Sequence, residues 1–265
     1  MNNYEKLEGM VAATFTPLDE NGDVNLSVID KYADWIASTP IKGVFVCGTT
    51  GEFSSLAIDE RKLILEKWLV SARKRFKVIA HVGSNCQRSA MELARHAAQV
   101  GADAIASIAP SFFKPGTVDE LVDFFAPICH SAAGLPFYYY NMPSITGVNL
   151  PVDKFLVEGK KKIPNLVGTK FTHNNLMEMG VCIELEQHRF EVLHGYDEIL
   201  ISGLAMGAVA GVGSTYNYIP NVYQAIFDSM KMNDLETARH NQIKSIRTVE
   251  VLLNMVAECA VAKRL

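Results

Sequence analysis

A lysine closes one of the apolar runs of the sequence. Lys170 ends the run Leu166–Lys170, which has the composition of a strand buried on both faces. Burial disfavours the cation of a lysine, so such a side chain offers a neutral amine that can attack a ketone and form a Schiff base. The position also fits the first residue of a solvent-exposed loop, because most lysines lie at the surface. The run alone leaves both interpretations open.

Three tyrosines close another run, Phe137–Tyr140. Because side chains alternate along a strand, one or two of them point to the interior of a barrel, next to the strand that carries Lys170. The phenol of Tyr140 could then move a proton between a substrate hydroxyl and the lysine adduct, as a general acid and base. A core tyrosine with a satisfied hydroxyl is the alternative interpretation.

The segment Gly48-Thr49-Thr50-Gly51-Glu52 combines small residues with two hydroxyls at a predicted strand-to-helix turn. Backbone N–H groups and hydroxyls in such a turn can bind a carboxylate, for example that of a keto acid. An ordinary turn with a helix N-cap explains the same residues. The glycine spacing matches neither a dinucleotide-binding fingerprint nor a phosphate-binding loop, which argues against a nucleotide site.

Further candidate binding residues lie at or just after the ends of the last two apolar runs. They are Gly195, Asp197, Glu198, Gly213 and Ser214. Several oriented donors and acceptors suit a polyol, because a buried polar group that is left unpaired is costly. The two carboxylates also suit a helix N-terminus, whose dipole they complement. His81 and His194 lack the spacing of metal ligands, so no metal site is predicted and an aldolase that uses a divalent ion is less favoured.

Eight short runs rich in valine, isoleucine and alanine lack polar alternation, as expected of buried parallel strands. The runs are Val11–Thr16, Val44–Val46, Val78–Val82, Ala104–Ile108, Phe137–Tyr140, Leu166–Lys170, Glu191–His194 and Ala208–Gly213. Helix-like stretches separate most of them. Four glycines before or near the start of a run suit left-handed turns from helix to strand: Gly43, Gly101, Gly168 and Gly207.

This alternation predicts an α/β fold, a (β/α)8 TIM barrel, with an open doubly wound sheet as the alternative. We expect a single domain over residues 1–265, with the barrel over 7–231 and a C-terminal helical extension over 232–265. The reactive residues above would then lie at the carboxyl ends of strands, where barrels carry their active sites.

Composition narrows the class of partner. The chain is 49% hydrophobic and 20% charged with a net charge of −4, which fits one globular domain and gives no support for nucleic-acid or membrane binding. No apolar run suits a signal core or a membrane span, so we expect a cytoplasmic location and a small-molecule substrate. The five scattered cysteines indicate reduced thiols, and Schiff-base chemistry needs no external cofactor.

Three motifs together resemble the dihydrodipicolinate synthase/N-acetylneuraminate lyase family over nearly the whole chain. The motifs are Gly48–Glu52, Tyr140–Pro143 and Gly168–Lys170. The resemblance implies that Lys170 forms a Schiff base with a pyruvate-type 2-keto acid and that Tyr140 shuttles protons. It also implies that Thr49 and Thr50 bind the carboxylate.

The segment Pro143–Gly147 lacks the arginine with which synthases of this family usually hold a second carboxylate. The later polar residues resemble the sialate lyase branch, in which such residues contact the polyol tail of the sugar. The implied sugar contacts are Thr172, Gly195, Asp197, Glu198, Gly213 and Ser214. The resemblance thus implies a lyase that cleaves N-acetylneuraminate to N-acetylmannosamine and pyruvate. The alternatives are a 2-keto-3-deoxy sugar-acid aldolase, a related pyruvate-dependent synthase, and a catalytically silent keto-acid-binding barrel.

Two features depart from the family pattern. Phe112-Phe113 stands where many relatives have a tyrosine that reaches the site of a neighbouring subunit, so an intersubunit hydroxyl is not expected. The sequence also ends sooner than the pattern leads us to expect, which predicts a shortened C-terminal helical extension. Relatives are often tetramers, so the resemblance implies a homo-oligomer, with a homotetramer as the expected form.

Overall fold

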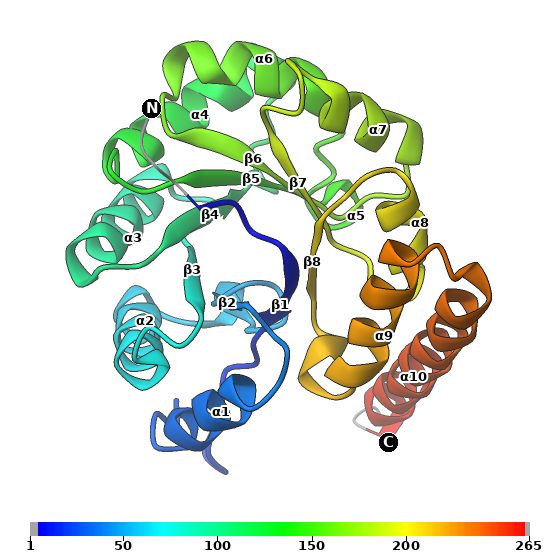
Figure 1. Ribbon diagram of the computed structural model, residues 1–265. Helices are drawn as coiled ribbons and strands as arrows, with labels where there is room; N and C mark the ends of the chain where they lie inside the picture. The colour runs from blue at the N-terminus through cyan, green and yellow to red at the C-terminus, as the bar shows by residue number, and fades with distance from the viewer. Residues whose placement is uncertain (1–4, 263–265) are drawn as a thin grey trace.

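A computed structural model of the protein describes the backbone of residues 5–262 and the side chains of residues 5–254. Eight parallel strands form a closed barrel in which sequence neighbours pair and β8 pairs with β1. Helices surround this ring of strands (Figure 1). The prediction of a (β/α)8 TIM barrel is therefore confirmed, and the open sheet is excluded.

Each strand overlaps one of the eight predicted runs. The strands are β1 Gly9–Ala13, β2 Gly43–Val46, β3 Lys77–His81, β4 Ala104–Ile108, β5 Phe137–Asn141, β6 Leu166–Phe171, β7 Glu191–His194 and β8 Ala210–Gly213. The helices are α1 Val28–Ala37, α2 Ile58–Ala72, α3 Gln87–Val100, α4 Val118–His130, α5 Pro143–Thr146, α6 Val152–Lys162, α7 Leu176–Glu184, α8 Leu200–Ala205, α9 Pro220–Lys231 and α10 Leu235–Ala262. Three short 3-10 turns are η1 Phe53–Ser55, η2 Asp197–Ile199 and η3 Thr215–Asn217.

Strand side chains alternate between the barrel interior and the layer beneath the helices. Tyr138 and Tyr140 belong to the interior cluster, whereas Tyr139 belongs to the outer one. The ring of Tyr139 packs 5.4 Å from that of Phe125 on α4 and 4.6 Å from that of Phe155 on α6. The period of two along β5 thus places two tyrosines inside the barrel, as the alternation predicts.

The amino end of the barrel is closed by a buried carboxyl group. Oε2 of Glu191 accepts a hydrogen bond from the Leu7 amide at 2.9 Å and one from the Tyr138 hydroxyl at 3.0 Å. Burial raises the pKa of Glu191, and these two hydrogen bonds partly offset that effect. The interior of the barrel therefore has a packed floor at this end.

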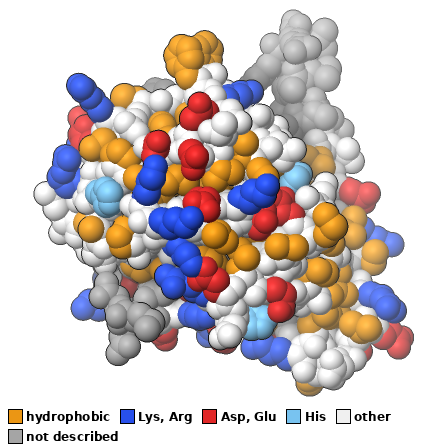
Figure 2. Space-filling view, turned by 90° about the horizontal axis from the view of Figure 1, so that it is seen from above, with side chains coloured by type: hydrophobic (Ala, Val, Ile, Leu, Met, Phe, Trp, Pro, Cys, Tyr) orange, Lys and Arg blue, Asp and Glu red, His pale blue; other side chains and the backbone are white. Residues whose placement is uncertain are grey.

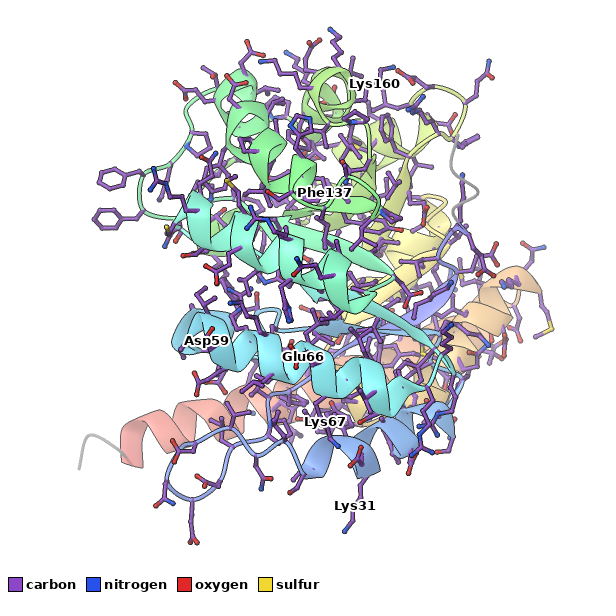
Figure 3. The ribbon with its side chains drawn as sticks, turned by 90° about the vertical axis from the view of Figure 1, so that its left-hand side faces the viewer. Lys31, Asp59, Glu66, Lys67, Phe137 and Lys160 are labelled. Carbon is purple, nitrogen blue, oxygen red and sulfur yellow. The ribbon has the colours of Figure 1, made fainter. Side chains whose placement is uncertain are left out.

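Charged side chains cover the outer helices. On α2, Lys67 is 2.6 Å from Asp30 of α1, and Glu66 is 2.8 Å from His96 of α3, so the ion pairs connect neighbouring helices (Figure 3). Such exposed pairs contribute little to stability. Figure 2 shows basic and acidic side chains interspersed over one face of the molecule, without a field of one sign.

The last helix follows the barrel and packs along α9 (Figure 1). Its position agrees with a helical extension after residue 231, although the shortening of that extension stays a prediction. Residues 1–4 and 263–265, which the predicted single domain includes, lie outside the described residues. Within the described part of the chain, no helix has the length and apolarity that crossing a lipid bilayer requires.

Two of the four glycine predictions are wrong. Gly101 and Gly207 have φ angles of +84° and +103°, as expected of left-handed turns. Gly43 and Gly168 instead lie within β2 and β6. At Gly168 a Cβ atom would overlap the main chain of Glu191 on β7, so glycine is needed there for the close approach of two strands.

We expect Gly168→Ala to lower the free energy of unfolding by about 1–3 kcal/mol, because the added methyl group overpacks the β6–β7 contact. Urea unfolding measures the change. Gly134→Ala is the matched control, since nothing lies within 4 Å of a Cβ at Gly134. Equal unfolding midpoints for the two variants would show that the close approach constrains nothing.

Candidate active site

The register of two neighbouring strands brings the predicted lysine and tyrosine together. Tyr140 of β5 pairs with Lys170 of β6. Lys170 is only 4% exposed, and its Nζ lies 4.1 Å from the ring centroid of Tyr140 and 4.4 Å from that of Phe45. The amine therefore lies inside the barrel between two aromatic rings, and the alternative of a solvent-exposed loop is wrong.

The Tyr140 hydroxyl connects this interior with the rim of the barrel. It lies 3.2 Å from Thr49 Oγ1 and donates to Met142 Sδ at 3.0 Å. Tyr140 is buried, whereas Thr49 is exposed and Thr50 half-buried. A phenol in this place can exchange protons with a molecule bound between the loop and the amine.

The glycine-threonine loop is held in an unusual backbone conformation. Cys47 and Glu52, which flank it, both have a φ of +54°, a left-handed conformation uncommon for residues other than glycine. At Gly48 a Cβ would lie 2.7 Å from the Phe45 ring. The loop thus folds closely over the aromatic residue beneath Lys170, and such strained positions persist only where the surroundings fix them.

A buried histidine and a buried arginine support this loop from behind. His81 Nδ1 is 2.8 Å from the Cys47 carbonyl oxygen, and the Arg61 guanidinium donates to the carbonyls of His81 at 2.7 Å and Gly83 at 2.9 Å. Burial, then the charge of Arg61, lowers the pKa of His81 well below its ordinary value. The neutral imidazole therefore donates its Nδ1 proton to the Cys47 carbonyl oxygen and holds the start of the loop.

The carboxyl ends of β6, β7 and β8 carry a second group of polar side chains. Thr172 is buried, and among the described residues its Oγ1 has no hydrogen-bond partner. A Cβ at Gly195 would overlap that oxygen, so the backbone just after β7 lies directly against it. A buried hydroxyl without a partner is costly unless a bound molecule pairs with it.

Asp197 is buried and firmly held. Its Oδ2 accepts hydrogen bonds from the Thr215 amide at 2.8 Å and the Thr215 hydroxyl at 2.6 Å, while its Oδ1 lies where a Cβ of Gly213 would be. Burial raises the pKa of Asp197, and the Thr215 hydrogen bonds and the charge of Lys170 partly offset this. Glu198 and Ser214 beside it are half-buried. Asp197 and Lys170 are thus close enough for the charge of Lys170 to act on the carboxylate.

Sequence reasoning did not single out several residues of the site. Phe45 lies at an inward position of a run in which every residue is apolar. The close contact between its ring and Gly48 has no signature in the sequence. Met142 was interpreted only as part of a turn, although it follows Tyr140 by two residues. Arg61 is one of many charged residues on an amphipathic helix, so only the fold distinguishes it. Because side chains alternate along a strand, the position of Phe45 in its run could have indicated that its ring faces the barrel interior.

Phe112 and Phe113 lie apart from these groups. They are 78% and 85% exposed, and their rings pack edge to face at 5.0 Å. Neither contacts Lys170 or Tyr140 in any described interaction. Among the side chains that the structure describes, no group of three or more His, Cys, Asp or Glu residues could hold a metal ion.

Comparison with known proteins identifies the family. A sequence profile of the dihydrodipicolinate synthetase family matches residues 6–263. The chain belongs to this family. The resemblance that the three motifs indicated is therefore confirmed.

Individual members of the dihydrodipicolinate synthetase family match most of the chain. The N-acetylneuraminate lyase of Mus musculus is 41% identical over 254 residues, which cover 95% of this chain and 79% of that protein. The N-acetylneuraminate lyase of Gallus gallus is 44% identical over 245 residues, which cover 91% and 80%. The solved N-acetylneuraminate lyase of Proteus mirabilis has a TM-score of 0.92 at 36% identity, covering 94% of this chain and 84% of that one.

His194, at the end of β7, gives a pH dependence that can be tested. It is buried against Gly203 of α8, and burial lowers its pKa from 6.5 to about 4. The unfolded chain therefore binds a proton at His194 below pH 6.5, whereas the folded chain does not until about pH 4. Stability is lost as the pH falls through this window.

The free energy of unfolding should fall less between pH 7 and pH 4.5 in His194→Phe than in the unchanged protein, by up to about 3 kcal/mol. The reason is that the variant has no imidazole to protonate. Urea unfolding at pH 7 and at about pH 4.5 measures it. His130→Gln, which changes an exposed histidine, is the control and should keep the pH dependence of the unchanged protein. An undiminished pH dependence in His194→Phe would contradict the assignment.

Proposed function

We propose that the protein is a class I, Schiff-base lyase that cleaves N-acetylneuraminate to N-acetylmannosamine and pyruvate. The observation that supports this most is the burial of Lys170 between Phe45 and Tyr140 at the carboxyl end of β6. It is the position expected of a nucleophilic lysine in a barrel enzyme. The relatives named N-acetylneuraminate lyase, at 41% and 44% identity, support the choice of substrate.

In this proposal the two polar groups of the site bind opposite ends of the substrate. The loop with Thr49 and Thr50 receives the carboxylate of the keto acid through hydroxyl and backbone donors. The polyol tail lies against the ends of β6, β7 and β8. Its contacts are Thr172, Gly195, Asp197, Glu198, Gly213 and Ser214. The unpaired hydroxyl of Thr172 supports this placement, because a sugar hydroxyl would satisfy it.

The reaction begins when the neutral amine of Lys170 attacks C2 of the open-chain sugar acid. The carbinolamine loses water and becomes an iminium ion, and Tyr140 supplies and removes the protons that this step requires. Tyr140 then takes the proton of the C4 hydroxyl, and the C3–C4 bond breaks. Its electron pair moves towards the iminium nitrogen, which leaves an enamine and releases N-acetylmannosamine as an aldehyde.

Protonation of the enamine at C3 regenerates the iminium ion. Water then adds at C2 and releases pyruvate, which restores the free amine of Lys170. The aromatic faces of Phe45 and Tyr140, about 4 Å from Nζ, favour the cationic iminium over a neutral adduct. All electrons that the cleavage displaces are held by the substrate and the lysine, so no external cofactor is needed.

We expect borohydride to trap the pyruvate imine of Lys170 as a stable covalent adduct. Mass spectrometry of the intact protein and its peptides measures the adduct, which should be absent from Lys170→Ala. Lys160→Ala, at a half-buried lysine that pairs with Glu186 on the outside of the barrel, is the control and should label normally. A wild-type chain without an adduct, or an adduct retained in Lys170→Ala, would falsify the Schiff-base proposal.

We expect Tyr140→Phe to lower kcat for N-acetylneuraminate cleavage by about 10²–10⁴-fold, because the phenol that transfers the protons is lost. Coupled measurement of pyruvate release gives kcat. The control is Tyr139→Phe, which removes a hydroxyl on the outer face of β5 and should have a small effect. Faster release of pyruvate from 2-keto-3-deoxygluconate than from N-acetylneuraminate would favour the sugar-acid aldolase instead.

The proposal includes a homotetramer in the cytoplasm, and the resemblance to the family implies the subunit number. The exposed Phe112 and Phe113 would then lie at a subunit boundary. Light scattering after size exclusion measures the subunit number.

A further inference from the structure

A chain of buried hydrogen bonds connects the Asp197 carboxylate with the last helix. The Thr215 hydroxyl, which donates to Asp197 Oδ2 at 2.6 Å, also contacts the Tyr223 hydroxyl on α9. That hydroxyl lies 2.8 Å from Ser245 Oγ on α10. All four side chains are buried, and Ser245 is 0% exposed. The carboxylate is thus linked to a helix that lies outside the eight-fold repeat.

The same helix also holds the main chain of Asp197. Gln242 Nε2 donates to the Asp197 carbonyl oxygen at 3.0 Å, and Ser245 Oγ donates to it at 3.2 Å. Gln242 Oε1 accepts a hydrogen bond of 2.8 Å from the backbone N–H of Ile201, in the first turn of α8. Both the carbonyl and the carboxylate of Asp197 are therefore fixed by connections that lead to α10.

Such a network restricts geometry more than it adds stability. Buried polar groups must all be paired to avoid a large cost, and an apolar contact between α9 and α10 would bury the surface more simply. A connected network, however, fixes where the oxygen atoms of its members lie, and the single proton of Ser245 goes either to Tyr223 or to the Asp197 carbonyl. Here that arrangement ends on a carboxylate whose Oδ1 lies against Gly213, among the proposed sugar contacts.

We propose that Tyr223, Gln242 and Ser245 are positioning residues that orient Asp197 towards the polyol tail of the substrate, so that α10 contributes to substrate selectivity. This inference rests on the proposed function. The three side chains are remote from the reacting atoms and act through Asp197. Their effect therefore appears with substrates that carry a polyol tail and is absent from imine formation at Lys170.

Two variants remove one polar side-chain group each with little change in shape. Tyr223→Phe loses the hydrogen bonds to Thr215 and Ser245, and Gln242→Met loses those to Asp197, Ser245 and Ile201. We expect each to lower kcat/KM for N-acetylneuraminate about tenfold, mainly through KM, because a loosely held carboxylate binds the tail less well. Borohydride trapping with pyruvate and cleavage of 4-hydroxy-2-oxobutanoate, which has no polyol tail, should change by less than about twofold.

The matched controls are Asn241→Ala and Ser229→Ala. Both change a buried polar residue on α10 or α9, and the Asn241 side-chain amide donates within its own helix, to the Thr237 carbonyl at 3.0 Å. Neither belongs to the chain of hydrogen bonds that ends at Asp197. We expect both controls to keep the kinetic constants of the unchanged protein for both substrates.

A double-mutant cycle tests whether the effect passes through Asp197. If it does, Tyr223→Phe has little further effect on N-acetylneuraminate cleavage in an Asp197→Ala background, whereas independent effects would multiply. Multiplying effects, unchanged N-acetylneuraminate kinetics in both variants, or equal losses with both substrates would overturn the positioning role. If the wild-type chain still traps the pyruvate imine in that case, the proposed function is retained and only the positioning role fails. A wild-type chain that traps no pyruvate overturns the proposed function, and the positioning role with it.

Discussion

The pairing register of β5 and β6 is the constraint on which the site depends. It places Tyr140 beside Lys170, and because alternate residues of a strand face opposite sides, a slip of β6 by one residue would turn Lys170 out of the barrel. Closure of the sheet fixes this register from both directions, since every strand has two partners. The glycine-threonine loop, packed over Phe45 at the end of β2, then reaches the Tyr140 hydroxyl of β5, a strand with which β2 does not pair.

An amine buried in this way needs an environment that tolerates both its neutral and its charged forms. The two aromatic faces next to Nζ provide that, because they are apolar yet attract a cation. A carboxylate in direct contact would instead hold the lysine as an ammonium ion, which cannot attack a ketone. The charge of Lys170 lowers the pKa of Asp197, but the Asp197 carboxylate is bound by Thr215. The division of the site into an aromatic and a polar side is therefore compatible with a reactive lysine.

The fold could be predicted from the sequence because each buried strand is a continuous apolar run, and eight such runs separated by helices have few ways to close. The inward direction of Lys170 could not, since an apolar run that ends in lysine fits a core strand or a loop equally well. Gly168 was assigned to a turn because a strand glycine that admits the main chain of Glu191 has no local signature. The links from Asp197 to Tyr223 and Ser245 join distant parts of the chain, so only tertiary structure reveals them.

The carboxyl group of Glu191, bonded to Leu7 and Tyr138, makes the barrel a well with one opening. Substrate and products must therefore enter and leave through the carboxyl end of the barrel. A substrate cleaved in such a well leaves its fragments in sequence, because the piece attached to the lysine lies deepest and the detached piece stands in its way. In the proposed mechanism the keto-acid fragment is still bonded to Lys170 when the aldehyde departs, and the closed amino end leaves the aldehyde one way out, past the loops at the carboxyl end.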